Sequence, residues 1–350
     1  MNRILDNDLI NIVEEDIEWE KFRGKTVMVT GASGMVGSYF VRTLLKLNDL
    51  KNMDIHVICV VRNINKLGRD VRENENVEIL AHDVTEPMDY AEKIHYIIHA
   101  ASPASPLIMK EDPVGTIAAN VLGTFNTLQL ATAKGAEGYM FISSREIYGQ
   151  PSEDQEFFKE DSYGFVDPLD PRSCYPEGKK AAETMCASFR EQYGLNTKVA
   201  RLAHTYGPGM SIYDGRVQAD FLKNVLFHED IVMKSEGLPV RTYTYIADAV
   251  SGMFRILLNG TDMVYNIGDE NAKISIRELA DMLVKITPEK KLSVKMEIPE
   301  GGTKGCAPFT LGILDSSKLR KLGWKPLYTI EEGFLRTIQY LEIEKENGRL

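Results

Sequence analysis

Tyr175 and Lys179 are two residues whose types and spacing can do chemistry. They lie four positions apart, ahead of a helix-like run at 180–185, so both side chains share one helix face. A nearby ammonium favours the phenolate form of tyrosine, and a phenolate can remove a proton from a hydroxyl group. Because this spacing is also common by chance, the pair has to be judged together with the elements that position it.

A second reactive group follows the apolar run 139–143, which we predict to be a strand. The run ends in Ser143 and is followed by Ser144 and Glu146, which supply hydroxyls and a carboxylate. Ligands bind at the carboxyl ends of the strands in parallel α/β sheets. We therefore expect these side chains to face the same site as Tyr175.

The segment 31–37 has the order that a dinucleotide site needs. The apolar run 26–30 leads directly into it, and Val36, Phe40 and Leu44 then recur at helical spacing. Glycines let the backbone approach a pyrophosphate, whose charge the free N–H groups of a helix N-terminus can bind. A glycine-rich turn without a ligand is the alternative, but its place between strand and helix favours the cofactor site. The predicted contacts are Gly31, Ser33, Gly34, Met35, Val36 and Gly37.

Two charged residues bear on which dinucleotide binds. Asp83, after the run 77–81, can accept a hydrogen bond from an adenine amino group, although aspartate in such a loop is more often a turn or cap residue. After the run 55–61 an acid for the ribose 2′-hydroxyl is expected, but the chain has Arg62, which suits a 2′-phosphate or is a solvated surface charge. These residues leave NAD and NADP both open. Other predicted cofactor contacts are Val84, Ala100 and Ala101.

The elements that must position these residues alternate, from Thr26 onward, between short apolar runs and helix-like stretches. This rhythm predicts an α/β fold with a doubly wound parallel sheet of the Rossmann type. Beyond about residue 203 the pattern becomes irregular, which we interpret as a smaller C-terminal α/β substrate-binding lobe. The expected strands are 26–30, 55–61, 77–81, 96–99, 139–143 and 197–202, and the expected later helices are 216–227, 246–258 and 275–286.

The predicted organisation has three parts. Residues 1–24 form an amphipathic N-terminal arm, 25–202 form the NAD(P)-binding domain, and 203–350 form mainly the substrate lobe. A strand at 263–266 can return to the first domain, so we assign about 241–268 to that domain.

Composition narrows the class of protein. A chain of 350 residues with 43% hydrophobic residues can bury a substantial core. Its net charge of −10 argues against a general nucleic-acid or anionic-membrane binder. The four cysteines form no CxxC pair, and no stretch has the roughly 18 to 20 apolar residues that a membrane helix needs. No signal-peptide pattern is present, so we expect a cytoplasmic protein. We also expect no metal site.

The glycine loop, Ser144, Tyr175 and Lys179 together resemble the extended short-chain dehydrogenase/reductase family, in its NAD-dependent epimerase/dehydratase group. The middle of the chain is similar to the UDP-glucuronate decarboxylase, or UDP-xylose synthase, branch. The resemblance covers roughly residues 25–340. The segments that carry it most clearly are 99–106, 171–179, 182–186 and 214–217.

The resemblance implies roles for the matching residues. It makes Tyr175 the base, Lys179 its electrostatic partner and a ribose contact, and Ser144 the hydroxyl that hydrogen-bonds the sugar O4. Glu146 matches the family's active-site glutamate. Asn120 matches a residue near the active site, although an asparagine there can equally satisfy buried backbone groups.

Further substrate contacts are implied in the same way. Arg216 and Arg241 match residues that contact the nucleotide diphosphate, and Arg241 also matches an arginine proposed as proton donor in decarboxylation. Ser102, in the segment 99–106, is a further implied substrate contact. Considered alone, either arginine would be a solvated surface charge.

Three departures from the family pattern bear on the substrate. Arg145 stands where decarboxylases have serine and 4,6-dehydratases have aspartate, and it can pair with a substrate carboxylate if it points inward. His204 replaces the usual asparagine, and we interpret it as a modified substrate contact. The family's C-terminal arginine is missing from 307–315, which leaves the identity of the nucleotide open.

The resemblance implies a sugar-nucleotide enzyme with tightly held NAD. The expected reaction begins when Tyr175 takes the proton of the sugar 4-hydroxyl as hydride leaves C4, and it ends in decarboxylation of UDP-glucuronate to UDP-xylose. Two alternatives share that oxidation: a 4-epimerase, and a 4,6-dehydratase in which Glu146 removes the C5 proton. A third alternative is a non-catalytic NAD(P)- or sugar-nucleotide-binding regulator.

The resemblance also implies an assembly and a pathway. A homodimer is expected, with helices around 114–133 and 175–193 packed across a two-fold axis. Synthesis of surface-polysaccharide precursors suits such an enzyme.

Overall fold

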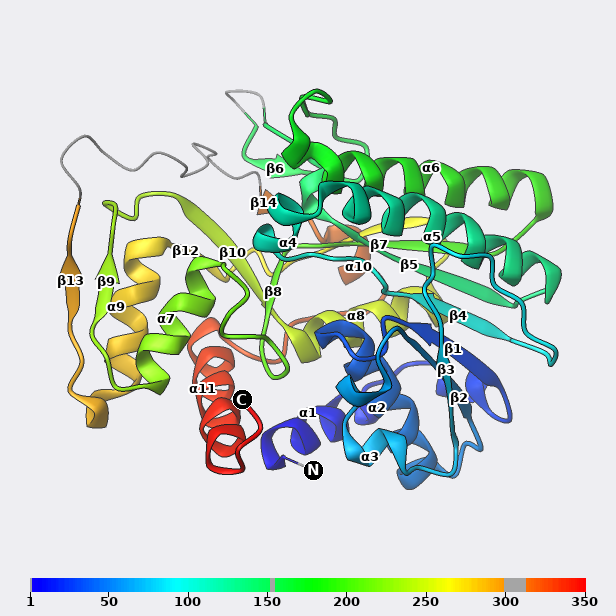
Figure 1. The fold of residues 1–350 in the computed structure, drawn as a ribbon, viewed down its shortest axis with the longest axis horizontal. Coiled ribbons are helices and arrows are strands. Elements are labelled where there is room, and N and C mark those ends of the chain that lie inside the picture. The colour runs from blue at the N-terminus through cyan, green and yellow to red at the C-terminus, as the bar shows by residue number, and fades with distance from the viewer. Residues whose placement is uncertain (1, 152–154, 299–312) are drawn as a thin grey trace.

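The computed structural model describes residues 2–151, 155–298 and 313–350. Its main layer is a seven-stranded parallel sheet in the order β11-β7-β5-β4-β1-β2-β3, with helices on both faces (Figure 1). The predicted doubly wound α/β fold is confirmed. The strands are β1 (Thr26–Thr30), β2 (His56–Val61), β3 (Val77–Ala81), β4 (Tyr96–His99), β5 (Gly138–Ser144), β7 (Thr197–Leu202) and β11 (Val264–Ile267).

Each strand predicted from an apolar run overlaps one of these strands. The runs are continuous rather than alternating because helices cover both faces of the sheet. The strand order reverses between β1 and β4, and such a reversal opens a crevice at the carboxyl ends of the strands where ligands bind. In the register of the sheet Ser144 lies opposite Leu202, so the loops after β5 and β7 start at the same edge.

Four long helices cover the sheet. α5 (Pro113–Ala133) and α6 (Cys174–Tyr193) lie side by side over one face (Figure 1). α2 (Met35–Lys51) and α8 (Ile246–Asn259) contact strands on the other face.

Local signals in the sequence set the ends of these helices. α5 begins at Pro113, where a missing N–H is tolerated, and the Asp112 side chain caps it by accepting from the Gly115 amide at 2.8 Å. α6 ends at Gly194, whose φ of 68° is the left-handed conformation that stops helices.

A smaller part follows the main sheet. β8 (His204–Tyr206), β10 (Val240–Tyr245) and β12 (Lys273–Ser275) form a three-stranded sheet, while β11 returns to the edge of the main sheet beside β7. The domain boundaries themselves stay a prediction. Other elements of this part are α7 (Val217–Leu226), β9 (Ile231–Met233), α9 (Ile276–Ile286), β13 (Val294–Met296) and α11 (Ile330–Glu346).

Several short elements complete the fold. The short helices are α3 (Arg69–Arg72), α4 (Pro106–Glu111) and α10 (Ser317–Arg320). The 3₁₀ turns are η1 (Trp19–Phe22), η2 (Ile64–Lys66), η3 (Arg145–Tyr148), η4 (Pro171–Ser173) and η5 (Pro288–Lys290). The strands β6 (Phe157–Phe158) and β14 (Ile313–Leu314) form a pair. Most of the segment 307–315, from which the family's arginine is missing, lies outside the described residues.

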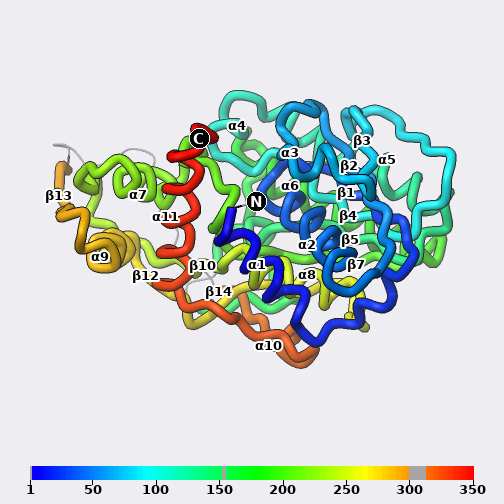
Figure 2. The backbone as a smooth tube through the Cα atoms, turned by 90° about the horizontal axis from the view of Figure 1, so that it is seen from below, coloured from blue at the N-terminus to red at the C-terminus, as the bar shows by residue number. Residues whose placement is uncertain are grey.

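The N-terminal segment packs against the core through the helix α1 (Arg3–Glu14). α1 contacts α2, α8 and α11, which brings the two ends of the chain together (Figure 2). Its buried Asp8 accepts hydrogen bonds from Tyr39 at 2.9 Å and Tyr245 at 2.7 Å, and it forms an ion pair with Arg336. This polar cluster fixes α1 between the two parts of the chain.

Two kinds of feature are absent from the described residues. No described helix has the length and apolar character that crossing a membrane requires. Within the same residues, no cluster of histidine, cysteine, aspartate and glutamate side chains is arranged to hold a metal ion.

Candidate active site

The turn between β1 and α2 leaves room that only glycine allows. Gly31 has a φ of +66°, and a Cβ atom there would lie 2.8 Å from the Ala100 carbonyl oxygen. A Cβ atom on Gly37 would lie 2.2 Å from the Gly31 oxygen. Side chains at these two positions would push the turn apart, so the glycines let β1, β4 and α2 approach one another closely.

This turn fits the diphosphate of a dinucleotide. Gly34 is the N-cap of α2 and donates its amide to Gly31 O at 2.9 Å, while its lack of a side chain leaves the helix without a side-chain cap. The first amides of a helix have no partner within the helix, and the helix dipole favours an anion there. Met35, Val36 and Gly37 occupy these positions.

Arg62 and Asp83 lie together beyond β2 and β3. One Asp83 oxygen accepts from the Thr85 amide at 3.0 Å and the Thr85 hydroxyl at 2.9 Å, and these bonds lower the pKa of the Asp83 carboxyl. The other oxygen is 4.0 Å from Arg62, whose side chain is 75% exposed. One Asp83 oxygen thus stabilises the turn and the other lies near the arginine, and the contact with adenine stays a prediction. Next to it, Val84 is buried.

The loop after β4 connects the predicted cofactor contacts to α5. The Ala101 amide donates to Thr30 Oγ1 at 3.3 Å, which fixes this loop beside the glycine turn. The Ser102 hydroxyl donates to Asn120 Oδ1 at 2.9 Å, and Asn120 in turn donates to Thr116 O at 2.8 Å. Asn120 is fully buried and engaged at both ends of its amide, which favours its structural alternative.

Tyr175 meets Ser144 at the carboxyl end of the sheet. Tyr175 is on the first turn of α6 and 7% exposed, and the Ser144 hydroxyl lies close enough to it to lower its pKa. Lys179, one turn later, lies 5.6 Å from the centre of the Tyr175 ring and donates to Ile142 O at 2.6 Å. The structure thus brings together the three residues that the sequence singled out for proton transfer.

Burial dominates the electrostatics of this group. Burial together with Glu146 raises the pKa of Tyr175 to about 12, against the lowering effects of Ser144, Arg216 and Arg172. Burial lowers the pKa of Lys179 to about 7, against the raising effect of Glu183. Assistance of the phenolate by Lys179 stays a prediction.

Glu146 has a partner that the sequence analysis did not identify. Arg172 donates to both Glu146 oxygens, at 3.1 and 2.8 Å, and this pair lies between η3 and η4. Both residues approach Tyr175 closely enough to shift its pKa, in opposite directions. The only sequence signal for the location of Arg172 near the active site was its position three residues before Tyr175.

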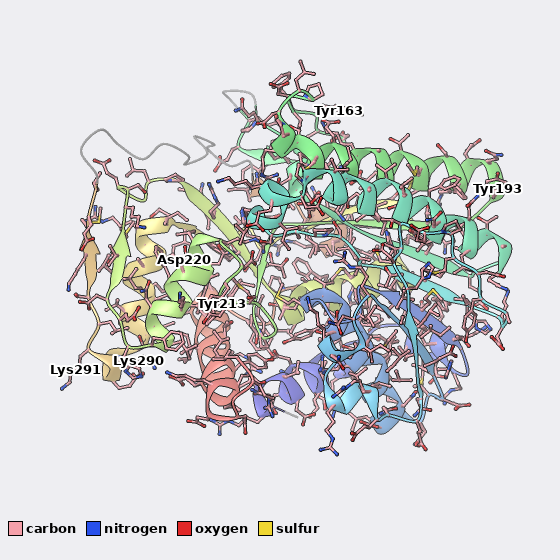
Figure 3. The ribbon with its side chains drawn as sticks, in the orientation of Figure 1. Tyr163, Tyr193, Tyr213, Asp220, Lys290 and Lys291 are labelled. Carbon is pink, nitrogen blue, oxygen red and sulfur yellow. The ribbon has the colours of Figure 1, made fainter. Side chains whose placement is uncertain are left out.

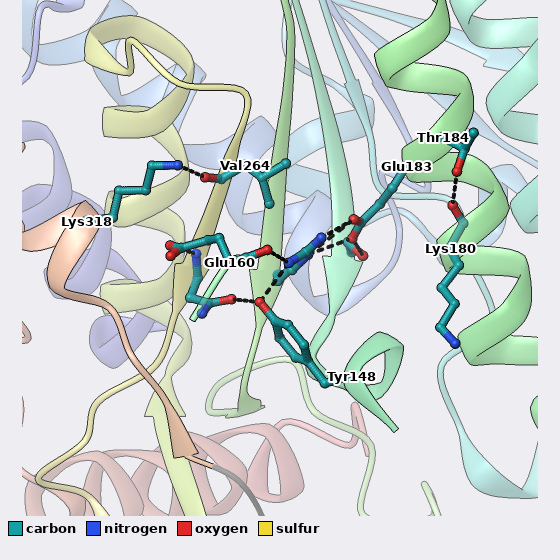
Figure 4. A network of polar contacts seen from close by, with 10 residues as sticks. Tyr148, Glu160, Lys180, Glu183, Thr184, Val264 and Lys318 are labelled. Carbon is teal, nitrogen blue, oxygen red and sulfur yellow. Dashed lines mark hydrogen bonds and ion pairs between the residues drawn. The ribbon is translucent and has the colours of Figure 1, made fainter. Parts of the chain in front are cut away.

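A buried polar network fixes α6 on the sheet (Figure 4). Arg201 of β7 donates to both Glu183 oxygens, the shortest bond being 2.6 Å, and each side chain is 11% exposed. Glu183 also accepts from Ser143 at 2.5 Å, and Arg201 also donates to Tyr148 at 2.7 Å. Because Glu183 lies one turn beyond Lys179, these bonds set how α6 presents Lys179 and Tyr175.

A cationic cluster faces the same edge of the sheet. Arg145 follows β5, His204 begins β8, and Arg241 is on β10. His204 lies within electrostatic range of Arg145, Arg241 and Arg216, which together with burial hold its pKa well below the ordinary value. Arg216 donates to Ala104 O at 2.6 Å at the start of α7. The structure thus gathers the predicted substrate arginines around one histidine.

A parallel Rossmann sheet, a glycine turn open to a diphosphate and a Ser–Tyr–Lys group define an enzyme of the extended short-chain dehydrogenase/reductase type. The profile described as the NAD dependent epimerase/dehydratase family matches residues 27–268. The chain belongs to this family.

Several proteins similar in sequence are UDP-glucuronic acid decarboxylases. UDP-glucuronic acid decarboxylase 1 of Xenopus tropicalis is 33% identical over 338 residues, covering 92% of this chain and 73% of the relative. UDP-glucuronic acid decarboxylase 6 of Arabidopsis thaliana is 33% identical over 313 residues, covering 88% and 86%. The resemblance to the decarboxylase branch is confirmed.

Solved structures support the fold. A UDP-glucuronic acid 4-epimerase from Bacillus cereus, in complex with UDP-glucuronic acid and NAD, matches with a TM-score of 0.73 at 21% identity. The match covers 91% of this chain and 99% of the other. A UDP-glucose 4-epimerase from Thermotoga maritima, with UDP-glucose, has a TM-score of 0.76 at 24% identity, covering 91% and 99%.

Proposed function

We propose that this enzyme is a UDP-glucuronate decarboxylase that makes UDP-xylose with NAD as a recycled cofactor. The observation that carries the proposal is identity of 33 to 34% with UDP-glucuronic acid decarboxylases along 88 to 92% of the chain. The meeting of Ser144, Tyr175 and Lys179 beside the glycine turn supports it.

Tyr175 is the proposed base for the sugar 4-hydroxyl. Ser144 lies close enough to Tyr175 to lower its pKa, so a single substrate oxygen could contact both hydroxyl groups. Ser144 lowers the pKa of Tyr175, so it favours the phenolate that accepts the proton. Lys179 is held by its hydrogen bond to the Ile142 carbonyl, and its Nζ lies 5.6 Å from the centre of the Tyr175 ring.

NAD supplies the hydride acceptor and donor at C4. The resulting C4 ketone is β to the C6 carboxylate, so the bond to carbon dioxide breaks with its electrons delocalised into an enolate. Reprotonation of that enolate at C5 and return of the hydride to C4 give the pentose. In this scheme Tyr175 holds the first proton and gives it back at the end.

Arg216 and Arg241 are the proposed contacts for the nucleotide diphosphate. Arg216 is already oriented by the Ala104 carbonyl and lies 3.4 Å from Asp214. We propose NAD rather than NADP because the matching family is NAD-dependent. Arg62 would then be solvated or would contact the ribose. Ser102 and Asn120, joined by a hydrogen bond of 2.9 Å, are the further proposed substrate contacts.

A homodimer through α5 and α6 is part of the proposal. Apolar side chains on the outer face of α5 are exposed, among them Val114 at 75%, Leu122 at 48% and Phe125 at 41%. Tyr193, at the end of the adjacent α6, is 54% exposed (Figure 3). A second copy would cover this paired face. We place the enzyme in the cytoplasm and in the synthesis of polysaccharide precursors.

The test is incubation of the purified protein with UDP-glucuronate and NAD, followed by mass analysis of the nucleotide product and by trapping of carbon dioxide. We expect a product lighter by carbon dioxide, no product from Tyr175→Phe, and normal activity from Tyr163→Phe, which alters an 88% exposed tyrosine (Figure 3).

Other products would replace the proposal. An isomer of unchanged mass would identify a 4-epimerase, and loss of water from a neutral nucleotide hexose would identify a 4,6-dehydratase. Bound cofactor with no turnover of any of these substrates would indicate a regulator.

A further inference from the structure

Arg145 is a partly buried cation to which no described residue supplies a hydrogen bond or a salt bridge. No hydrogen bond or ion pair joins its guanidinium to any described residue, and its Nε is buried without an acceptor. The acid next to it, Glu146, directs both oxygens to Arg172 instead. Five donors on a rigid planar group are therefore left for something outside the chain.

The surroundings of Arg145 make this arrangement costly. Burial, opposed by Glu146 and assisted by the neighbouring Arg241, lowers the pKa of Arg145 to about 10. Burying an unpaired charge is strongly unfavourable, and a second cation nearby adds repulsion. Binding of an anion would offset both costs because it supplies the missing partner.

This cation lies close to the reacting part of the site. Arg145 follows Ser144, which ends β5 beside Tyr175, and it is within electrostatic range of His204 and Arg241. The strand register aligns Ser144 with Leu202, which carries the chain after β7 to His204 beside the same site. Arg216, by contrast, is held at the start of α7 by Ala104.

His204 adds a neutral acceptor to the same place. Its ring is hydrogen-bonded to the Thr242 backbone, and its Nδ1 is buried without a partner. The low pKa keeps the ring uncharged, so a ring that donates to a backbone oxygen at one nitrogen accepts at the other. Nδ1 can thus accept a hydrogen bond from a sugar hydroxyl.

We propose that Arg145 is a specificity-determining residue that binds a carboxylate on the sugar ring, with His204 accepting from a neighbouring hydroxyl, so that the site selects nucleotide-linked uronic acids over neutral hexoses. The carboxylate carbon is attached to C5, next to the C4 that Tyr175 and Ser144 address. A guanidinium matches the two carboxylate oxygens with parallel hydrogen bonds. This inference rests on the proposed function for the reacting position only.

The test measures binding without turnover. In a Tyr175→Phe background with NAD present, isothermal titration calorimetry would give Kd values for UDP-glucuronate, UDP-glucose and UDP. Arg145→Met removes the charge and keeps the length of the side chain, and Arg145→Gln is the second variant should the first fail to fold. Arg69→Met, at an 80% exposed side chain on α3, is the control.

We expect Arg145→Met to raise the Kd for UDP-glucuronate about 10- to 100-fold, which is the contribution of a hydrogen-bonded pair of charges. The Kd values for UDP-glucose and UDP should not change. The thermal midpoint of the variant without ligands should rise because a repelled cation is gone. An unchanged Kd for UDP-glucuronate would overturn the inference, as would an equal loss for all three ligands, which would place Arg145 on the diphosphate.

The outcomes separate this inference from the proposed function. Selective weakening of UDP-glucuronate together with an absence of carbon dioxide release would keep the carboxylate site and reject decarboxylation. Carbon dioxide release with an unchanged Kd in Arg145→Met would keep decarboxylation and reject the carboxylate site.

Discussion

The ion pair between Arg201 and Glu183 is expected to be the strongest single polar anchor of α6. Its two side chains are 11% exposed each and joined by three hydrogen bonds of 2.6 to 3.1 Å. Arg201→Met would leave a buried carboxylate with Ser143 as its remaining hydrogen-bond partner. Breaking a buried pair from one side costs about 3 to 5 kcal/mol, a large share of a typical free energy of unfolding.

Removing both charges should cost less. The double variant Arg201→Met/Glu183→Leu replaces the pair by apolar groups, which is often close to neutral, so the coupling between the two sites should be favourable by about 2 kcal/mol or more. The control is Arg69→Met, which breaks the exposed pair with Glu73 and should change stability by less than about 0.5 kcal/mol.

Urea unfolding followed by circular dichroism would give the four free energies of unfolding in this cycle. A loss of less than about 1 kcal/mol in Arg201→Met would refute the reasoning, because it would mean that water solvates the carboxylate. A double variant as unstable as the single one would refute it as well, since the cost would then come from packing.

Three other predictions follow from the site. Gly37→Ala should abolish measurable NAD binding in calorimetry, because the added Cβ would lie 2.2 Å from the Gly31 oxygen. Retained affinity would contradict the assignment of the glycine turn to the NAD diphosphate. The pKa of Lys179 is lowered on folding from 10.5 to about 7, so the unfolded chain binds more protons between these values and stability should rise with pH there. Urea titrations at several pH values should show this rise flattened in Lys179→Met, and an identical slope would contradict burial of the lysine. Arg172→Met should raise the pKa of Tyr175, moving the ascending limb of the pH profile of kcat/KM to higher pH; an unmoved limb would exclude the electrostatic coupling.

The sequence predicted the main sheet well because buried parallel strands give continuous apolar runs. The run 197–202 and the later strand at 263–266 both appeared where the structure has β7 and β11. The register of β10 with β8, which brings Arg241 to the same side as His204, depends on long-range pairing and left no local signal.

The site was predictable where one helix or one loop contains the whole pattern. Tyr175 and Lys179 share a helix face, and the glycine turn is continuous in sequence. The pairing of Glu146 with Arg172 joins two turns 26 residues apart, so neither residue alone indicated it. Asn120 was ambiguous because an amide serves a ligand or a buried backbone equally well, and only its contacts to Ser102 and Thr116 separate these.

In the proposed mechanism Tyr175 starts a reversible oxidation at C4 of the sugar. The most direct measurement is stopped-flow absorbance of reduced nicotinamide after mixing the enzyme and NAD with UDP-glucuronate, compared with substrate carrying deuterium at C4. We predict a transient that rises and then decays, a slower rise with the deuterated substrate, and no rise in Tyr175→Phe. Release of carbon dioxide with equal rates for both substrates and no transient would contradict the account.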